Sequence, residues 1–363
     1  MTANTTNYPF CAIEGQPALQ LALLLLAVDP LLGGLLIEGP RGTAKSTSAR
    51  ALADLLPSGQ WVNLPLGTSE EQLQGSLDLQ AALQDAAISF KPGLLAQAHQ
   101  GILYVDEVNL LPDRLVDLLL DVSASGINRV ERDGVSHQHA ARIALVGTMN
   151  PEEGQLRPQL LDRFGMYVRL PNVPDVATRK RIVLARMAFD ADPQAFCQRH
   201  AEQQNALAAQ LLAARANLEN VAWPDAVHDA VAELCQQAGV EGVRADLVML
   251  RAARASAALA GRTQVNLADV QQVAELALAH RRSADAQAPK PTPAGDTQQA
   301  EPPSNPPPSE PPPSQNNGQG DAHADDATAS GSQGGDAWGG MAAPQASAIH
   351  SVPGWRPGLP KKA

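Results

Sequence analysis

Apolar residues in the first half of the chain fall into short runs separated by polar or glycine-containing stretches. The runs have the length of buried strands, and stretches with helical spacing lie between them. Such alternation favours a three-layer α/β core, in which helices cover both faces of a parallel sheet. The predicted strands lie at 35–37, 61–64, 101–105, 142–147 and 166–169.

Beyond residue 174 the spacing of apolar residues is helical throughout. The second domain is therefore predicted to be all-α. Its helices are expected at 175–188, 205–217, 224–237, 243–260 and 267–281.

The last part of the chain has a different composition. Residues 283–363 are rich in Pro, Gly, Ser and Asp and contain few large apolar side chains. Such a segment cannot bury enough surface to offset its conformational entropy, so we expect a disordered tail. Its terminal stretch around Trp355 is either a docking peptide or a frayed end. The predicted domains are 1–172, 173–282 and 283–363.

Charge and hydropathy narrow the class of protein. The formal net charge of −11 over 363 residues argues against broad binding to nucleic acid or to an anionic membrane. The longest apolar run, at 21–28, is far shorter than the roughly 20 residues that a membrane span needs. No basic stretch followed by an apolar core marks a signal peptide. We therefore expect a cytoplasmic protein.

Residues 39–46 join the first predicted strand to a helix. A glycine-bearing loop at a helix start turns backbone N–H groups toward an anion. Lys45 can then reach the β- and γ-phosphates of ATP, and Ser46 can hold Mg²⁺. Ala44 replaces the glycine of the strict pattern, and we expect it to begin the helix, where alanine is favourable. The predicted binding residues are Gly39, Pro40, Arg41, Gly42, Thr43, Ala44, Lys45, Ser46 and Thr47.

Polar residues follow two of the other predicted strands directly. Asp106 and Glu107 stand at the end of the strand at 101–105, and ligands bind at the carboxyl ends of strands in open α/β sheets. Asp106 can bind the Mg²⁺ of a nucleotide, and Glu107 can orient the attacking water. Asn150, at the end of a neighbouring strand, could hydrogen-bond the γ-phosphate or that water.

Two arginines outside the loop are candidates for catalysis. Arg163 precedes the strand at 166–169, and Arg244 begins a helix of the second domain. Arginines in an acidic protein usually form surface ion pairs. The functional interpretation is that Arg163 reaches across a subunit interface to a neighbour's nucleotide. Arg244 could lean back onto the phosphates as a second sensor.

Two further segments interrupt the α/β pattern. Residues 66–93 are irregular, and so long an irregular stretch inside such a core indicates a functional insertion. Residues 128–139 read as a β-hairpin around Asp133-Gly134. Its His and Arg residues are metal ligands, a nucleic-acid probe or simply solvated.

The order of these parts resembles that of AAA+ ATPases, with a P-loop core followed by a helical lid. The resemblance is closest to the ATPase subunits of magnesium chelatase, the I subunit or the N-terminal half of the D subunit. It runs from about residue 8 to residue 281. It rests on Tyr8-Pro9-Phe10, Gly15-Gln16, Leu64-Pro65-Leu66-Gly67, Gly75-Ser76-Leu77-Asp78-Leu79, Lys91-Pro92-Gly93-Leu94-Leu95, residues 103–111, residues 147–154 and Arg163-Phe164-Gly165.

The resemblance implies a ring, expected to be hexameric, whose ATP turnover drives Mg²⁺ insertion into protoporphyrin IX by a separate large catalytic subunit. It makes Asp106 and Glu107 the residues of hydrolysis, Asn150 the first sensor, Arg163 the arginine finger and Arg244 the second sensor. The tail resembles the linker that leads to an integrin-type (VWA) domain in the D subunit. A protein with that domain is therefore an expected partner.

Other functions are compatible with these motifs. Cobalt chelatases use related ATPases, and MoxR-type remodelling ATPases share the insertion and the hairpin and also act with integrin-type partners. A DNA motor fits poorly with the acidic charge. Alanine at position 44 also resembles the D subunit, in which hydrolysis is often weak, but the charged and polar catalytic positions are intact here. We therefore predict ATP hydrolysis.

Overall fold

The structure is a computed structural model that describes residues 6–57, 59–78, 89–132, 135–171 and 175–282. The predictions made for the tail, for the middle of the insertion and for the Asp133-Gly134 turn lie outside these ranges.

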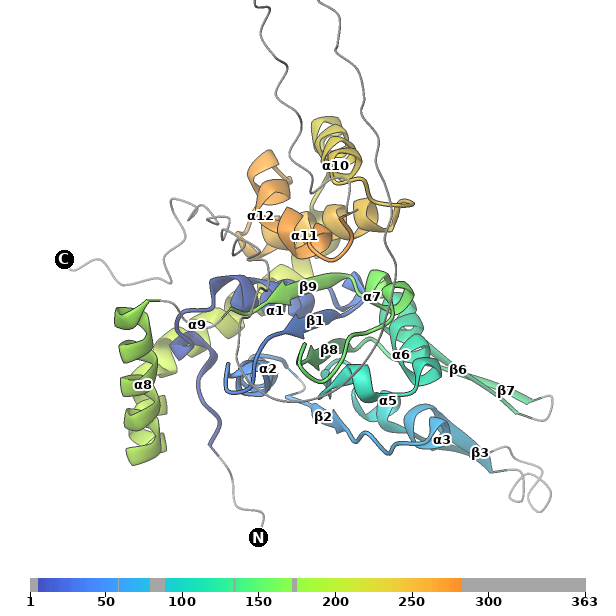
Figure 1. Ribbon diagram of the computed structural model, residues 1–363, viewed down its shortest axis with the longest axis horizontal. Helices are drawn as coiled ribbons and strands as arrows, with labels where there is room; N and C mark the ends of the chain where they lie inside the picture. The colour runs from blue at the N-terminus through green and yellow to red at the C-terminus, as the bar shows by residue number, and fades with distance from the viewer. Residues whose placement is uncertain (1–5, 58, 79–88, 133–134, 172–174, 283–363) are drawn as a thin grey trace, which may run out of the picture. The chain divides into compact units, whose positions relative to one another are not determined.

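Five parallel strands form the central sheet, in the order β2-β5-β8-β1-β9 (Figure 1). All five predicted strands are present, and the prediction of a parallel α/β core is confirmed. The fourth of them in sequence, β8, begins two residues later than expected, because the backbone at Arg142 leaves the ladder to accept a hydrogen bond from Gln100. The strands are β1 (Leu35–Glu38), β2 (Trp61–Leu64), β5 (Ile102–Val105), β8 (Ala144–Met149) and β9 (Met166–Arg169).

Helices bury both faces of this sheet. Side chains alternate along a strand, so Leu35 and Ile37 face one layer of helices while Leu36 faces the other. The first layer contains α1 (Pro17–Val28) and α2 (Lys45–Ala53). The second layer contains α5 (Leu94–Gln97), α6 (Asp113–Ser125) and α7 (Pro158–Arg163).

Two antiparallel hairpins extend from one side of the core (Figure 1). The predicted hairpin is confirmed as β6 (Ile127–Arg132) with β7 (Val135–Ala140), and the insertion contributes α3 (Glu70–Gln74), β3 (Gly75–Asp78) and β4 (Ser89–Pro92). The Phe90 ring of β4 stacks on His137 of β7, with ring centroids 4.1 Å apart. Among the described residues, no group of His, Cys, Asp and Glu side chains could hold a metal ion, so the metal interpretation of this hairpin has no support.

The rest of the described chain is helical, as predicted. Helices α11 and α12 pack on each other, and they contact the core at α1 and β9. The helices are α8 (Val176–Ala191), α9 (Pro193–Asn217), α10 (Asp225–Gln237), α11 (Arg244–Leu259) and α12 (Leu267–Leu278). Short 3-10 helices occur at Phe10–Ala12, Pro30–Leu32, Val108–Leu110 and Leu218–Asn220.

Helix α9 begins twelve residues earlier than the predicted start at 205. Its first half carries too few apolar residues to show helical periodicity. Instead, Asp192 caps the helix through the Ala195 N–H, and Pro193 occupies the first turn. Phe196 then packs against Tyr8 and Phe189. Capping and tertiary packing therefore extend the helix beyond what its sequence pattern indicates.

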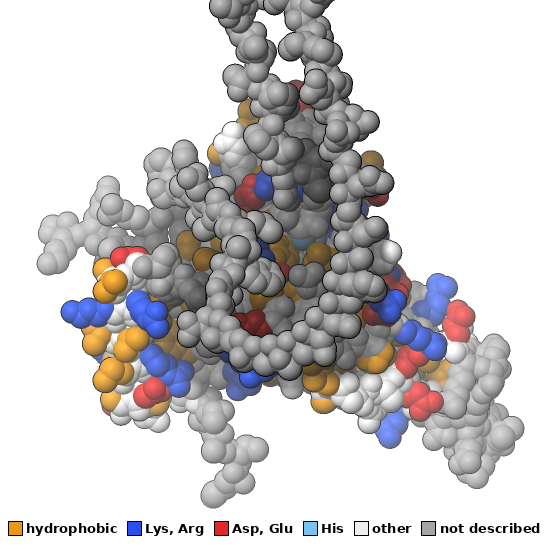
Figure 2. Space-filling view, viewed as in Figure 1, with side chains coloured by type: hydrophobic (Ala, Val, Ile, Leu, Met, Phe, Trp, Pro, Cys, Tyr) orange, Lys and Arg blue, Asp and Glu red, His pale blue; other side chains and the backbone are white. Residues whose placement is uncertain are grey.

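Helix α8 exposes an apolar stripe formed by Val176, Val183, Leu184 and Met187. In Figure 2 hydrophobic and basic side chains are interspersed on the surface of the molecule at the position of α8. Large apolar side chains gathered on one exposed face are typical of contact surfaces. Within the described residues, no helix is both long enough and apolar enough to cross a membrane.

Candidate nucleotide-binding site

The loop between β1 and α2 is closed by its own contacts and by the N-terminal segment. Lys45 donates from Nζ to the carbonyl oxygens of Gly39 and Pro40, the second at 3.1 Å. The Gln16 amide donates to the Thr43 carbonyl at 2.6 Å. Partial burial lowers the pKa of Lys45, although the nearby Asp106 carboxylate opposes this shift. The ammonium therefore lies at the loop, where phosphates can replace the carbonyl oxygens as its partners.

Ala44 does not begin the helix, so this prediction was wrong. Helix α2 begins at Lys45, and Ala44 is the residue before it, in the left-handed conformation with φ of 59°. Glycine adopts this conformation without a steric penalty, whereas a Cβ costs about 1–2 kcal/mol. The loop therefore keeps the geometry that glycine usually provides, under strain.

Two side chains, those of Tyr104 and Thr148, hold the acidic pair at the end of β5. Asp106 accepts hydrogen bonds at Oδ1 from the Thr148 hydroxyl at 2.6 Å and from the Tyr104 hydroxyl at 3.0 Å. The Glu107 backbone N–H donates to Thr148 Oγ1 at 3.2 Å. Thr148 thus joins β8 to the Asp106 carboxylate and to the Glu107 backbone, a role that the sequence did not reveal. No described residue hydrogen-bonds Oδ2 of Asp106, which leaves this oxygen open to a cation.

Asn150 and Glu153 lie on the loop that follows β8. Asn150 is buried, and its side-chain oxygen accepts a hydrogen bond from the Glu152 N–H at 3.3 Å. Glu153 forms an ion pair with Arg41 of the phosphate loop, and this pair lowers the pKa of Glu153. The neighbouring Glu153 carboxyl raises the pKa of Glu107. Glu153 was not among the predicted site residues, although it stands three residues after Asn150.

These elements enclose a cavity of about 560 Å³. One wall consists of the loop and the ends of β5 and β8. The opposite wall comes from α8 and from the N-terminal segment, neither of which was predicted to contribute. The lining residues are Arg41, Gly42, Thr43, Ala44, Lys45, Ser46, Thr47, Ser48, Asp106, Glu107, Tyr104, Thr148, Met149, Asn150, Tyr8, Ile13, Ile182 and Arg186.

The residues in this cavity fit a magnesium nucleotide. A Ser46 hydroxyl and an Asp106 carboxylate provide the hard oxygen ligands that Mg²⁺ prefers. The helix N-terminus and Lys45 provide the positive charge that a phosphate chain requires. Ile13 and Ile182 offer an apolar surface away from the phosphate end.

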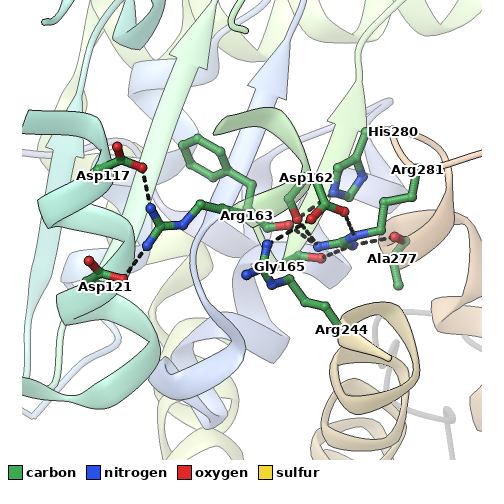
Figure 3. A network of polar contacts seen from close by, with 10 residues as sticks. Asp117, Asp121, Asp162, Arg163, Gly165, Arg244, Ala277, His280 and Arg281 are labelled. Atoms are coloured by element: carbon green, nitrogen blue, oxygen red, sulfur yellow. Dashed lines mark hydrogen bonds and ion pairs between the residues drawn. The ribbon is translucent and has the colours of Figure 1, made fainter. Parts of the chain in front are cut away.

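The two arginines predicted as a finger in trans and as a second sensor lie elsewhere. Arg163, at the end of α7, is 25% exposed and pairs with Asp117 and Asp121 of α6. Arg244, at the start of α11, pairs with Asp162 at 2.8 Å. Neither lines the cavity of its own chain, as far as the described residues show. Figure 3 shows Arg163 directed toward α6, while Asp162 faces the helical domain.

Comparisons with known proteins agree with this architecture. A family model described as an AAA domain of the dynein-related subfamily matches residues 34–164. A second model, an AAA lid domain, matches residues 228–304. The magnesium-chelatase subunit ChlI of Olisthodiscus luteus is 45% identical over 307 residues, which cover 78% of this chain and 92% of that subunit. This chain belongs to the ChlI-like AAA ATPases.

One further relative and one solved complex are also similar to this chain. An uncharacterised protein of Mycobacterium tuberculosis, Rv2850c, is 52% identical over 284 residues. That match covers 77% of this chain, and this chain spans 45% of the length of Rv2850c. A solved complex between the subunits BchI and BchD of magnesium chelatase contains a chain that is 44% identical, with a TM-score of 0.45, over 77% of this chain and 97% of that one.

The strained Ala44 leads to a prediction for this ChlI-like ATPase. We expect Ala44→Gly to raise the free energy of unfolding by about 0.5–1 kcal/mol, because relief of the left-handed strain outweighs the greater entropy of glycine in the unfolded chain. Urea unfolding measures the change. Ala206→Gly, at an exposed position inside α9, is the control and is expected to destabilise the protein by about 1 kcal/mol. Equal losses in both variants would contradict the assignment of strain to position 44.

The lid of this ATPase is anchored to the core beside Arg163. Arg281, only 2% exposed, donates to the carbonyl oxygens of Asp162 at 2.7 Å and of Gly165 at 3.0 Å. His280 donates from Nε2 to the Phe164 carbonyl at 3.0 Å, and its Nδ1 is buried without a partner among the described residues. Burial, assisted by the charge of Arg281, lowers the pKa of His280 to about 3.

This anchor predicts sensitivity to acid. The unfolded chain takes up a proton at His280 near pH 6.5, but the folded chain does so only near pH 3. Stability is therefore complete above pH 6.5 and falls as the pH decreases through this window, by about 2 kcal/mol at pH 5. Urea unfolding at pH 7.5 and pH 5 measures the loss. We expect His280→Gln to remove most of it and His228→Gln, at an exposed position, to leave it intact. An undiminished loss in His280→Gln would refute the assignment.

Proposed function

We propose that this ChlI-like ATPase is the motor subunit of a metal chelatase. Its ATP hydrolysis would drive Mg²⁺ insertion into protoporphyrin IX by a separate, large catalytic subunit. The observation that carries the proposal is the 45% identity that extends over 92% of a magnesium-chelatase ChlI subunit. The cavity supports it, because Lys45, Asp106 and Glu107 all line one nucleotide-sized space.

Within one chain, the residues divide the chemistry of ATP hydrolysis. The loop N–H groups and Lys45 bind the phosphates, and Ser46 and Asp106 would hold Mg²⁺, which neutralises phosphate charge. Glu107 orients and polarises the attacking water, and the buried Asn150 directs its amide at the γ-phosphate or that water. Thr148 keeps Asp106 and Glu107 in place through the contacts described above.

The arginine finger requires a second subunit in this proposal. Arg163 pairs with α6 and does not line its own cavity, and Arg244 is bound to Asp162, the residue before Arg163. In a ring, a hexamer by family resemblance, Arg163 would approach the nucleotide of the next protomer, and Arg244 would lean back onto the phosphates as the second sensor. The exposed apolar stripe of α8, whose Ile182 and Arg186 line the cavity, supports a protein contact beside the site.

The expected partners are the large catalytic subunit and a protein with an integrin-type (VWA) domain. Cobalt chelatases use related ATPases, and residues that bind a nucleotide do not select the metal, so Co²⁺ insertion into a corrinoid precursor is the nearest alternative. The second candidate function is MoxR-type remodelling of a partner protein. Rv2850c, which is 52% identical to this chain, is longer and uncharacterised. The experiment below therefore also tests the remodelling function.

Reconstitution tests the proposal. The purified chain is combined with the large subunit and the VWA-domain protein of the same organism, ATP, Mg²⁺ and protoporphyrin IX. We expect ATP-dependent formation of fluorescent magnesium protoporphyrin, absent with Lys45→Ala. A parallel reaction supplies Co²⁺ and a corrinoid precursor. ATP hydrolysis that the VWA protein stimulates, without metal insertion in either reaction, would overturn the chelatase proposal in favour of remodelling.

A further inference from the structure

An ion pair lies at the mouth of the nucleotide cavity. Arg41 of the phosphate loop pairs with Glu153 of the loop after β8, and their side chains are 79% and 20% exposed. Arg41 lines the cavity together with Lys45 and Glu107. The pair therefore links the loop that binds phosphates to the loop that carries Asn150.

The backbone fixes Glu153 more firmly than Arg41. The Glu153 N–H donates to the Asn150 carbonyl at 3.0 Å, in a tight turn whose second hydrogen bond is that from Glu152 to the Asn150 side chain. By contrast, the Arg41 side chain is 79% exposed, and Glu153 is its one ion-pair partner among the described residues. Arg41 is thus the partner with room to move, while Glu153 stays in place.

Oε2 of Glu153, the oxygen that does not face Arg41, is buried and accepts no hydrogen bond of standard geometry from the described residues. The Glu107 carboxyl lies close enough to Glu153 for the two groups to interact electrostatically. The charged groups around Glu107 are thus Glu153, Asp106, Arg41 and Lys45. Arg41 is the cation that neutralises Glu153, and its removal would leave two carboxylates facing each other.

We infer that Glu153 is a positioning residue that holds the Arg41 guanidinium at the cavity mouth and yields it to the terminal phosphate of ATP. A phosphate carries more charge than a carboxylate and binds a guanidinium through two parallel hydrogen bonds. An exposed ion pair is weak, so the exchange is easily reached. Once Arg41 has moved, repulsion from Glu153 turns Glu107 toward the attacking water. The inference rests on ATP binding by the AAA domain and not on the chelatase role.

The test compares Glu153→Gln with the wild-type full-length chain. Without the competing carboxylate, we expect ATP to bind about two- to fivefold tighter, as measured by calorimetry. Affinity for AMP, which lacks the terminal phosphates, stays unchanged. We expect kcat to fall by a similar factor, because the repulsion that turns Glu107 is lost. Tighter binding with slower turnover is a combination that a merely structural role would not produce.

Two variants make the test decisive. Glu152→Gln removes a charge from the same loop, near Arg41 but without an ion pair, and is expected to change neither affinity nor kcat. In an Arg41→Gln background, Glu153→Gln is expected to have no further effect on ATP affinity. An affinity gain that persists in this background, or that Glu152→Gln reproduces, would show simple charge repulsion and overturn the inference. Unchanged ATP affinity in Glu153→Gln would overturn it as well.

Discussion

Replacement of Lys45 by alanine is expected to lower kcat/KM for ATP by about 10²–10³-fold. The Lys45 ammonium lies at the loop between Gly39 and Pro40, partly buried. It is placed to bind the β- and γ-phosphates, where charge increases during hydrolysis. A neutral side chain at this position leaves the backbone N–H groups without that cation. Phosphate release by the purified protein measures the effect, and nucleotide titration separates binding from turnover.

Lys180→Ala is the matched control for this prediction. Lys180 is an exposed cation on α8 and does not line the cavity, so its removal changes the net charge equally without affecting the phosphates. We expect its turnover to stay within twofold of wild type. Turnover and affinity equal to wild type in Lys45→Ala would mean that ATP does not bind in this loop.

The second large effect concerns Arg163. We expect Arg163→Ala to retain ATP affinity and to lose about 10³-fold in turnover, because a finger supplied in trans stabilises charge only in the transition state. A mixture with Lys45→Ala distinguishes trans from cis action. Some sites in mixed rings combine an intact Lys45 with a neighbour's intact Arg163, so the mixture is expected to exceed either variant alone in phosphate release.

Arg157→Ala provides the comparison on the same helix. Arg157 flanks the start of α7, is mostly exposed and pairs with Asp113 of α6 at 2.7 Å. Its loss also removes an ion pair with α6, so it reports the structural share of the Arg163 effect. A mixture no more active than its parents, or an equal loss in Arg157→Ala, would argue against a finger in trans.

Much of the fold follows from sequence because its signals are local. Short apolar runs that end at Asp106 or Asn150, placed after a glycine-bearing phosphate loop, indicate the strand ends of an open sheet. The features that were missed depend on contacts between distant segments. Helix α8 brings Arg186 to the cavity, and the α6 carboxylates hold Arg163, but neither helix has a pattern that distinguishes it from an ordinary amphipathic or charged helix.

Position 44 shows a second limit of prediction from sequence. Helix propensity favours alanine at a helix start, but the loop must reverse direction before α2, and that requirement places Ala44 at positive φ. Local preference is therefore overridden by the path of the loop. The same holds for the first half of α9, where contacts with Tyr8 replace periodicity as the cause of the helix.

The end of α7 contacts both α6 and the lid through two adjacent residues. Asp162 binds Arg244 and Arg281 of the lid, and the next residue in the chain is Arg163. If Arg163 acts on a neighbour's nucleotide as proposed, a displacement of its side chain would reach the lid through a single peptide bond. ATP hydrolysis at one site would then be coupled to the position of the helical domain in the adjacent protomer.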